Sequence, residues 1–336
     1  MTLTRPAPTR LAATTALAAL AACAFGLAPG TAAAALGTGV VDVTTNLAYQ
    51  NASAAGTGIV LTASGEVLTN NHVIRGATTI RVVDPATRRS YAAAVVGYSV
   101  ANDVAVLQVT APSHLHTVAL GNSATVRAGQ RVTAVGNAGG VGGPPSSARG
   151  KVTSIGRSIV ASDGQGISEQ LTGLIQIDAA LRPGDSGGPL LNANGRVVGM
   201  DTAASVSFAF QSAGEAYAIP INRALALAKQ MEAGRASATV HIGTTPFLGV
   251  NVAPASGNVS GGALIVGVVP GAPADLAGLV AGDTITALDG QPVATYDQLG
   301  AALLQYTAGA TVTLSWIDQM GTTQSAGVQT IAGPPQ

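Results

Sequence analysis

The sequence predicts a mainly β chain with two domains, one large and one smaller. Three observations support this prediction. The 336 residues include 43 glycines and 17 prolines, which favour short strands and turns over a helical bundle. Hydrophobic residues make up 47% of the chain, enough for a sizeable core. Short apolar runs are separated by Gly, Asn, Asp and Pro, a pattern typical of an all-β barrel or sandwich.

Charge and cysteine content exclude several classes of protein. The 16 basic and 16 acidic side chains cancel, so the chain lacks the broad basic surface of a nucleic-acid binder. The single cysteine, Cys23, excludes an intrachain disulfide and a zinc site made of several cysteines. His114 and His116 lie two residues apart on a loop without an evident third ligand. No metal ion or cofactor is therefore expected.

Residues 1–35 are expected to form an export signal. Two arginines precede a short Ala- and Leu-rich run, and small residues follow it up to Ala35. A basic start, an apolar middle and a small-residue exit are the parts of a secretory signal peptide. Two processing routes stay open. Cleavage near Ala33 or Ala35 is favoured and removes Cys23, whereas lipidation of Cys23 is suggested by the lipobox-like Leu20–Cys23. Either route predicts an exported protein, secreted or associated with the cell envelope.

The remaining chain divides into a large domain (36–233), a linker (234–244) and a smaller domain (245–334). The large domain is expected to consist of strands, with one convincing helix, Ile221–Met231, between a preceding Pro and a following Gly. Its apolar face is expected to contain Ile221, Leu225, Ala228 and Met231.

The smaller domain alternates strands with two helices, which predicts an α+β unit. A turn at 270–273 precedes a short helix, and Asp289-Gly290 ends a strand. Thr295 and Gln298 form the pattern of a capping box at the start of the second helix.

The most specific motif of the chain is Pro183-Gly184-Asp185-Ser186-Gly187-Gly188-Pro189. A serine hydroxyl becomes a nucleophile when a base takes its proton. Glycines around it allow a tight turn, in which the N–H groups of Gly184 and Ser186 would form an oxyanion hole. The motif predicts nucleophilic catalysis by Ser186.

His72, at the end of an apolar strand, is the best candidate for the base. Asp103 opens the apolar run 104–109, where a carboxylate would be largely desolvated and would need a partner. It is therefore the preferred third member, which would orient the imidazole. The alternatives are Asp84, Asp163, Asp178 and Asp201. The order His, Asp, Ser is that of chymotrypsin and predicts a double β-barrel.

The chain from about Val40 to Gly333 resembles HtrA (DegP-like) serine proteases, most closely secreted actinobacterial members. The matching segments are 56–60, 68–74, 102–107, 176–180, 187–189 and 218–221. This resemblance implies a chymotrypsin-like double β-barrel followed by one PDZ domain, with His72 as base, Asp103 as orienting acid and Ser186 as nucleophile. It implies hydrolysis of unfolded or extended proteins through an acyl-enzyme, as in protein quality control and stress response.

The smaller domain carries the PDZ part of the resemblance. Its expected peptide-binding residues are Phe247, Leu248, Gly249, Val250 and Leu299, with Leu303 beside them. Backbone N–H groups would hold the C-terminus of a peptide, which would add a strand to the sheet. Leu299 and Leu303 are equally compatible with a core position.

The chain departs from the family in ways that affect specificity and assembly. Asp185 stands where the family usually has Asn. Ala180 lies six residues before Ser186, where trypsin-like enzymes that cleave after basic residues carry an acid. Thr202 and the stretch after it are the expected walls of the specificity pocket. We therefore expect a preference for small or medium apolar residues at the cleavage site. In the family, the segment that precedes the first strand helps to form trimers. Here the segment before Val40 is short, so whether the chain forms a homo-oligomer such as a trimer stays an open question. The alternative functions are a latent protease that acts as a peptide-binding or chaperone-like protein, and an esterase.

Overall fold

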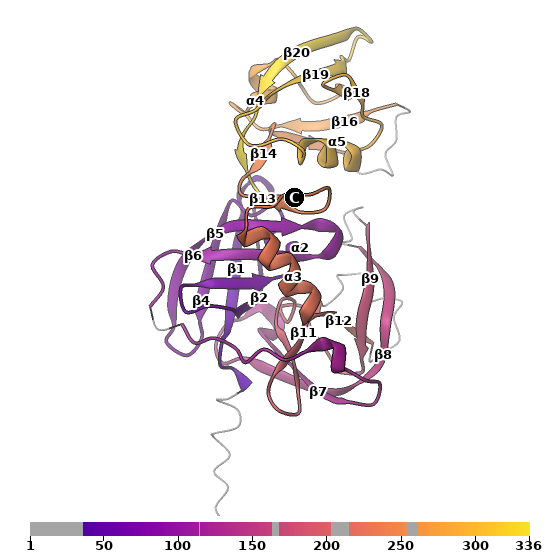
Figure 1. Ribbon diagram of the computed structural model, residues 1–336. Helices are drawn as coiled ribbons and strands as arrows, with labels where there is room; N and C mark the ends of the chain where they lie inside the picture. The colour runs from indigo at the N-terminus through magenta and orange to yellow at the C-terminus, as the bar shows by residue number, and fades with distance from the viewer. Residues whose placement is uncertain (1–35, 114, 163–167, 203–214, 254–260) are drawn as a thin grey trace, which may run out of the picture.

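The computed structural model describes residues 36–113, 115–162, 168–202, 215–253 and 261–336 (Figure 1). The expected export signal with Cys23, His114, Asp163 and most of the expected pocket wall after Thr202 lie outside the described residues. No helix in the described ranges is long and apolar enough to cross a membrane.

The first part of the chain forms a β-barrel. Its strands are β1 (Val40–Leu47), β2 (Ala52–Val60), β3 (Glu66–Thr69), β4 (Thr79–Asp84), β5 (Arg89–Ser99) and β6 (Val104–Val109). They follow the order β5-β4-β1-β2-β3-β6, and pairing of β5 with β6 closes the sheet. Short helical segments connect them: η1 (Ala48–Gln50), α2 (Asn71–Ile74) and η2 (Val100–Asn102). Alternating burial along β4 places Ile80 and Val82 inside the barrel.

A second closed barrel follows. Its strands are β7 (Arg131–Gly136), β8 (Ser146–Ser162), β9 (Ser168–Ile177), β10 (Pro189–Asn192), β11 (Val197–Thr202) and β12 (Ala216–Pro220), in the order β10-β11-β12-β9-β8-β7. The segments η3 (Ser123–Thr125) and η4 (Ala138–Gly140) lie before and after β7. The prediction of a mainly β fold with a double barrel is confirmed.

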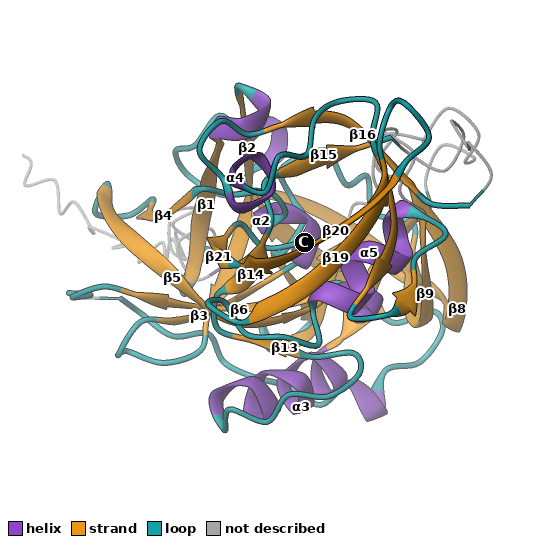
Figure 2. Ribbon diagram, turned by 90° about the horizontal axis from the view of Figure 1, so that it is seen from above, coloured by secondary structure: helices purple, strands orange, loops and turns teal. Residues whose placement is uncertain are grey.

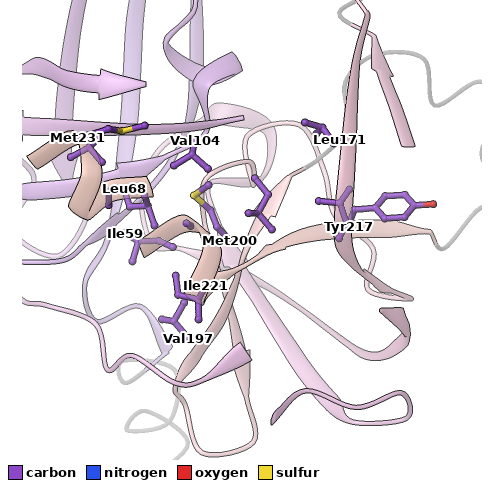
Figure 3. Packing of buried hydrophobic residues seen from close by; sticks show 14 of the residues in the cluster. Ile59, Leu68, Val104, Leu171, Val197, Met200, Tyr217, Ile221 and Met231 are labelled. Carbon is purple, nitrogen blue, oxygen red and sulfur yellow. The ribbon is translucent and has the colours of Figure 1, made fainter. Parts of the chain in front are cut away.

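The two barrels share a hydrophobic core. Ile59, Leu68 and Val104 of the first barrel belong to one cluster with Met200 and Ile221 (Figure 3). This contact brings the end of β3 and the start of β6 against β11 and against Ile221, the first residue of the helix after β12.

The helix α3 (Ile221–Glu232) covers the seam between the barrels (Figure 1). Its buried residues are Ile221, Ala224, Ala228 and Met231. Leu225, which we expected on this face, is half-buried and packs against the same core cluster, and Ala224 joins the buried residues.

The C-terminal domain is an α+β unit. Its strands are β14 (Thr245–Phe247), β15 (Val250–Val252), β16 (Ala263–Val268), β17 (Thr284–Leu288), β18 (Gln291–Pro292), β19 (Thr311–Ile317), β20 (Thr323–Gln329) and β21 (Ile331–Gly333). The main sheet has the order β15-β16-β17-β19-β20, and β14 pairs with β21. The helices α4 (Pro273–Leu276) and α5 (Tyr296–Leu303) pack beside it (Figure 2). Thr295 Oγ1 accepts from Gln298 N–H as expected, whereas Gln298 Oε1 accepts from Ala294 N–H, one residue earlier than a capping box requires.

Part of the expected linker is a strand. β13 (His241–Ile242) adds to the edge of β5, with His241 opposite Tyr98. Tyr98 is buried and shares a hydrogen bond of 2.9 Å with Thr245 of the C-terminal domain. The end of the described chain lies between the two domains, where the Pro335 carbonyl accepts from Gly76 N–H at 2.8 Å. The C-terminal domain is therefore held against the first barrel near α2 (Figure 1).

Candidate active site

His72 and Asp103 are in direct contact. His72 Nδ1 lies 3.0 Å from Asp103 Oδ1 and 2.9 Å from Oδ2. Asp103 Oδ1 also accepts from the backbone N–H of His72 at 3.0 Å. An ionised carboxylate only accepts, so Nδ1 of a neutral imidazole must carry the proton and Nε2 keeps a lone pair. The side chain of His72 is 29% exposed, whereas that of Asp103 is 3% exposed.

Local structure explains this contact. β3 ends at Thr69, and α2 turns His72 back toward the start of β6. Asp103 has a left-handed φ of 51° at the end of η2, and Asn70 Nδ2 donates to its backbone carbonyl at 2.9 Å. The Thr202 hydroxyl donates to Asp103 Oδ2 at 3.1 Å. The buried carboxylate is thus hydrogen bonded from both barrels, which offsets its desolvation.

Ser186 is buried and follows the loop after β9. Its carbonyl accepts from Thr57 N–H at 2.8 Å, which attaches it to β2. A Cβ on Gly56 would lie 2.7 Å from the Val73 side chain and 3.2 Å from the Ser186 carbonyl. Gly56 therefore lies between the residue that follows His72 and the backbone of Ser186. Gly56 thus contacts both the neighbour of His72 in α2 and the backbone of Ser186.

Gly184 adopts a conformation that other residues rarely adopt. Its φ is +97°, and an added Cβ would lie 2.1 Å from the Asn137 carbonyl. The Pro183 carbonyl accepts from Gly139 N–H at 2.7 Å. Because C=O and N–H point in opposite directions across a trans peptide, the N–H of Gly184 points away from Gly139. This N–H donates no hydrogen bond to another residue of the described ranges, so it is available to an oxyanion.

The segment 184–188 is attached to both barrels by hydrogen bonds. Thr57 Oγ1 donates to the Gly184 carbonyl at 2.6 Å. Gly187 N–H donates to the Asp201 carbonyl at 2.8 Å, and Asp201 N–H donates to the Gly188 carbonyl at 2.7 Å. These bonds fix the segment against β2 and β11, and so place it near Thr202 and Asp103.

Two buried acids accompany the segment. Asp185 accepts from the N–H of Arg182 at 2.9 Å and from the Ser146 hydroxyl at 3.3 Å. Burial raises the pKa of Asp185. Asp201 is fully buried, and neither of its carboxyl oxygens has a hydrogen-bond partner in the described part of the chain. Burial, and secondarily the charge of Asp185, raise the pKa of Asp201 well above the ordinary carboxyl value.

The other candidate acids and histidines have contacts elsewhere. Asp84 accepts from Ala86 and Thr87 in its own turn, and Asp178 accepts from Lys151 N–H. His241 lies next to carbonyls of Leu304 and Thr244 in the interdomain contact. No group of three or more His, Cys, Asp or Glu residues suited to a metal ion occurs in the part of the chain that the structure describes.

A cleft of about 540 Å³ joins the two domains. On the side of the two barrels, the cleft is lined by His72, Asp103 and Thr202. On the C-terminal domain it is lined by all of the expected peptide-binding residues, Phe247, Leu248, Gly249, Val250, Leu299 and Leu303. Ala180 is exposed and, like Gly184 and Ser186, is not part of this lining.

The expected carboxylate loop lies between β14 and β15. Gly249 has a φ of +82°, and an added Cβ would lie 2.1 Å from the Cβ of Ala272. Phe247 stacks on Tyr49 of η1, with ring centroids 5.2 Å apart. Leu299 and Leu303 are buried in the core cluster of the C-terminal domain and also line the cleft. Both interpretations of these leucines are therefore compatible with their positions.

Sequence reasoning missed the residues that join the domains. Tyr98, Thr245 and Pro335 lie far apart in the chain, and no local pattern relates them. It also missed the support of Asp103 by Asn70, although Asn70 lies within the segment that resembles the family.

Known proteins match both parts of the chain. Residues 56–200 match the trypsin-like peptidase domain, and residues 264–317 match the PDZ domain. The chain is 36% identical over 272 residues to the probable periplasmic serine protease do/HhoA-like of Haemophilus influenzae, covering 80% of this chain and 56% of the relative. It is 34% identical over 300 residues to serine protease PepD of Mycobacterium tuberculosis, covering 84% and 61%.

A solved structure also resembles the whole described arrangement. The HtrA-type protease AlgW with decapeptide matches with a TM-score of 0.51 and 26% identity, over 90% of this chain and 99% of that chain. The chain spans less than two thirds of the length of the two curated relatives above. With a trypsin-like peptidase domain followed by a PDZ domain, the chain belongs to the HtrA (DegP-like) family of serine proteases.

Proposed function

We propose that the chain is an exported serine endopeptidase that cleaves unfolded or extended proteins, with His72, Asp103 and Ser186 as its catalytic residues. The contact between His72 Nδ1 and the Asp103 carboxylate, at 2.9 and 3.0 Å, carries this proposal. It leaves Nε2 as the basic atom of a partly exposed imidazole. The periplasmic relatives support export.

The mechanism follows from these positions. His72 Nε2 takes the proton of the Ser186 hydroxyl as Oγ attacks the peptide carbonyl. Asp103 stabilises the imidazolium that forms, and the N–H groups of Gly184 and Ser186 bind the oxyanion. The imidazolium then gives its proton to the leaving amine, and an acyl-enzyme remains. A water molecule, activated by the same imidazole, releases the acyl group.

The matched test uses two serine variants of the full chain. Ser186→Ala removes the nucleophile, and we expect the kcat for casein hydrolysis to fall by as much as about 10⁶-fold. Ser64→Ala removes an exposed hydroxyl that bonds only Thr62, and we expect unchanged hydrolysis. Equal release of casein fragments by wild type and Ser186→Ala would reject the proposal.

Specificity for small or medium apolar residues is the second part of the proposal. Ala180 supplies no carboxylate to a basic side chain of the substrate, and Thr202 is occupied by its bond to Asp103. A peptide library digested by the full chain should show small or medium apolar residues on the acyl side of the cleaved bond. Strict cleavage after Arg or Lys would contradict this part.

The C-terminal domain is proposed to bind peptide C-termini for tethering or regulation. The left-handed turn at Gly249 precedes β15, and α5 lies beside it, so a peptide would add as a strand along β15. Calorimetry with Ser186→Ala prevents cleavage during the titration. Peptides with an apolar C-terminal residue should bind, and the same peptides with an amidated C-terminus should not. Equal affinity for both forms would remove this part.

A further inference from the structure

Asp201 is a buried acid that the mechanism above does not use. It lies in β11, one residue before Thr202, and is 0% exposed. Among the residues that the structure describes, neither carboxyl oxygen has a hydrogen-bond partner. An ionised carboxylate in this position would be strongly disfavoured, because burial shields it from bulk solvent and no donor of the described residues bonds it. The ordered structure therefore requires Asp201 to be a neutral carboxylic acid.

The backbone of Asp201 holds the nucleophile segment directly. Its carbonyl accepts from Gly187 N–H at 2.8 Å, and its N–H donates to the Gly188 carbonyl at 2.7 Å. These bonds lie immediately after Ser186. Ionisation of the Asp201 side chain would favour any rearrangement that brings water to it, and the segment after Ser186 is bonded directly to the backbone of Asp201.

Few charged groups face Asp201 from the elements around it. β10 carries no ionisable residue, and Tyr217 of β12 has its hydroxyl next to Glu215. The segments bonded to β11 carry the ionisable residues Asp185 and Arg182, before the nucleophile, and Tyr217 in β12, and Asp103 is bonded to Thr202. Among them, the Asp185 carboxylate raises the pKa of Asp201, and Arg182 acts on Asp185 in the opposite sense. In the described part of the chain, no cation lowers the pKa of Asp201 itself.

We propose that Asp201 is a positioning residue that holds the segment around Ser186 in its ordered form only while its carboxyl group is protonated. This inference rests on the proposed function as far as catalysis is concerned. The ordered form binds one proton more than a rearranged form with ionised Asp201. Asp201 stabilises the ordered segment around Ser186 fully when the pH is below the ordinary carboxyl pKa. This stabilisation is lost as the pH rises toward the raised pKa of Asp201.

The pH dependence of two full-length proteins tests the inference. Asp201→Asn is nearly isosteric and cannot ionise. We compare kcat/KM of this variant and wild type from about pH 5 to about pH 9, a range that exceeds the ordinary carboxyl pKa. The ratio of variant to wild type should rise with pH, by up to about tenfold per unit, the limit for one proton. A ratio that stays constant over the range would overturn the inference.

A matched control separates this effect from general loss of stability. Glu66 also has a raised pKa, about 7, but it lies in β3 and has no bond to the segment 184–188. Glu66→Gln should leave the pH dependence of kcat/KM equal to that of wild type. If Glu66→Gln and Asp201→Asn change it equally, the positioning role is wrong.

Infrared difference spectroscopy tests the protonation without any catalysis. In Ser186→Ala, a protonated carboxyl band should disappear as the pH rises. Asp42 and Glu66 give similar bands, because their pKa values are about 6 and about 7. The Asp201 band is therefore identified by its absence in Asp201→Asn. A band missing at neutral pH overturns the inference, even if casein cleavage succeeds.

A second variant serves if Asp201→Asn does not fold. Asp185→Asn removes the carboxylate that raises the pKa of Asp201, so the same band should disappear at lower pH than in the parent. An unshifted band would mean that the two acids do not interact. If no variant cleaves casein but the band behaves as described, the proposed function fails and the protonated Asp201 stands.

Discussion

Thr202 and Asp103 come from different barrels and share one hydrogen bond, in which Thr202 Oγ1 donates to Asp103 Oδ2 at 3.1 Å. Thr202→Val keeps the shape and removes the donor. A hydrogen bond to a charged group contributes about 1.5–3 kcal/mol, so kcat should fall by about tenfold to about a hundredfold. Thr202→Ser keeps the hydroxyl and is the control that should retain activity. Equal kcat values for the Val and Ser variants would deny the bond a role in catalysis.

Asp103→Asn should remove most of the activity with little change in KM. The amide cannot stabilise the imidazolium, and it favours the wrong tautomer of His72, so kcat should fall by about 10⁴-fold. The control is Asp84→Asn, which changes a buried carboxylate bonded only within its own turn. That variant should lose stability and keep its kcat. A similar kcat for both variants would show that Asp103 only supports the fold.

Gly184→Ala should abolish the oxyanion site. At a φ of +97° the new Cβ would lie 2.1 Å from the Asn137 carbonyl, so the turn must shift and move its N–H groups. Loss of an oxyanion donor lowers kcat by about 10²–10³. Gly195→Ala is a matched control, with a φ of +70° but no atom within 4 Å of the added Cβ. It should keep kcat and lose only stability, by about 1–2 kcal/mol.

The sequence predicted the fold class because strand signals are local. β4 alternates between exposed and buried residues, and the turns between strands carry glycine. The region 93–96 fits a helix or a strand by its sequence, and it lies in β5 because Ala93 pairs with β4 and residues 93–95 pair with β6. The pairing of His72 with Asp103 was predictable from chain order and motifs, since each motif begins or ends an apolar strand.

The remaining features depend on contacts between distant residues. β13 has only two residues, too few for an alternating pattern, and forms because the edge of β5 is open to it. Asp201 was considered only as an alternative acid for the imidazole. Its burial follows from closure of the second barrel, since its neighbours in β10 and β12 must first pair with β11. A sequence pattern does not show which carboxyl group will lack a hydrogen-bond partner in the folded structure.

Glu66 should make stability depend on pH. Burial raises the pKa of Glu66 from 4.5 to about 7, and Glu232 adds to this shift through a hydrogen bond and through its negative charge. A carboxyl group whose pKa is raised in the folded state stabilises the folded protein fully when the pH is below its pKa in the unfolded state. This contribution is lost as the pH rises toward 7. Glu66→Gln should therefore raise the Tm above pH 7 by about 1–3 °C. Below pH 4 the two proteins should differ less. Thermal unfolding at both pH values checks this, and a Tm difference independent of pH would contradict it.

Tyr98→Phe should loosen the C-terminal domain from the first barrel. The Tyr98 hydroxyl contacts Thr245 Oγ1 at 2.9 Å and accepts from Gln336 N–H at 3.4 Å. Its removal leaves buried groups unpaired, at a cost of about 1–3 kcal/mol. Amide hydrogen exchange should therefore speed up at Gly76, whose N–H donates to the Pro335 carbonyl.

Tyr91→Phe is the matched control for this loosening. The Tyr91 hydroxyl bonds the Ser113 carbonyl at 2.8 Å within the first barrel, so its removal costs a similar bond without touching the domain contact. Exchange at Gly76 should stay at the wild-type rate in this variant. Because Gly76 follows α2, which carries His72, faster exchange in Tyr98→Phe alone would connect the position of the C-terminal domain to the catalytic helix. Equal exchange in the two variants would show that the hydroxyl of Tyr98 does not hold the domains together.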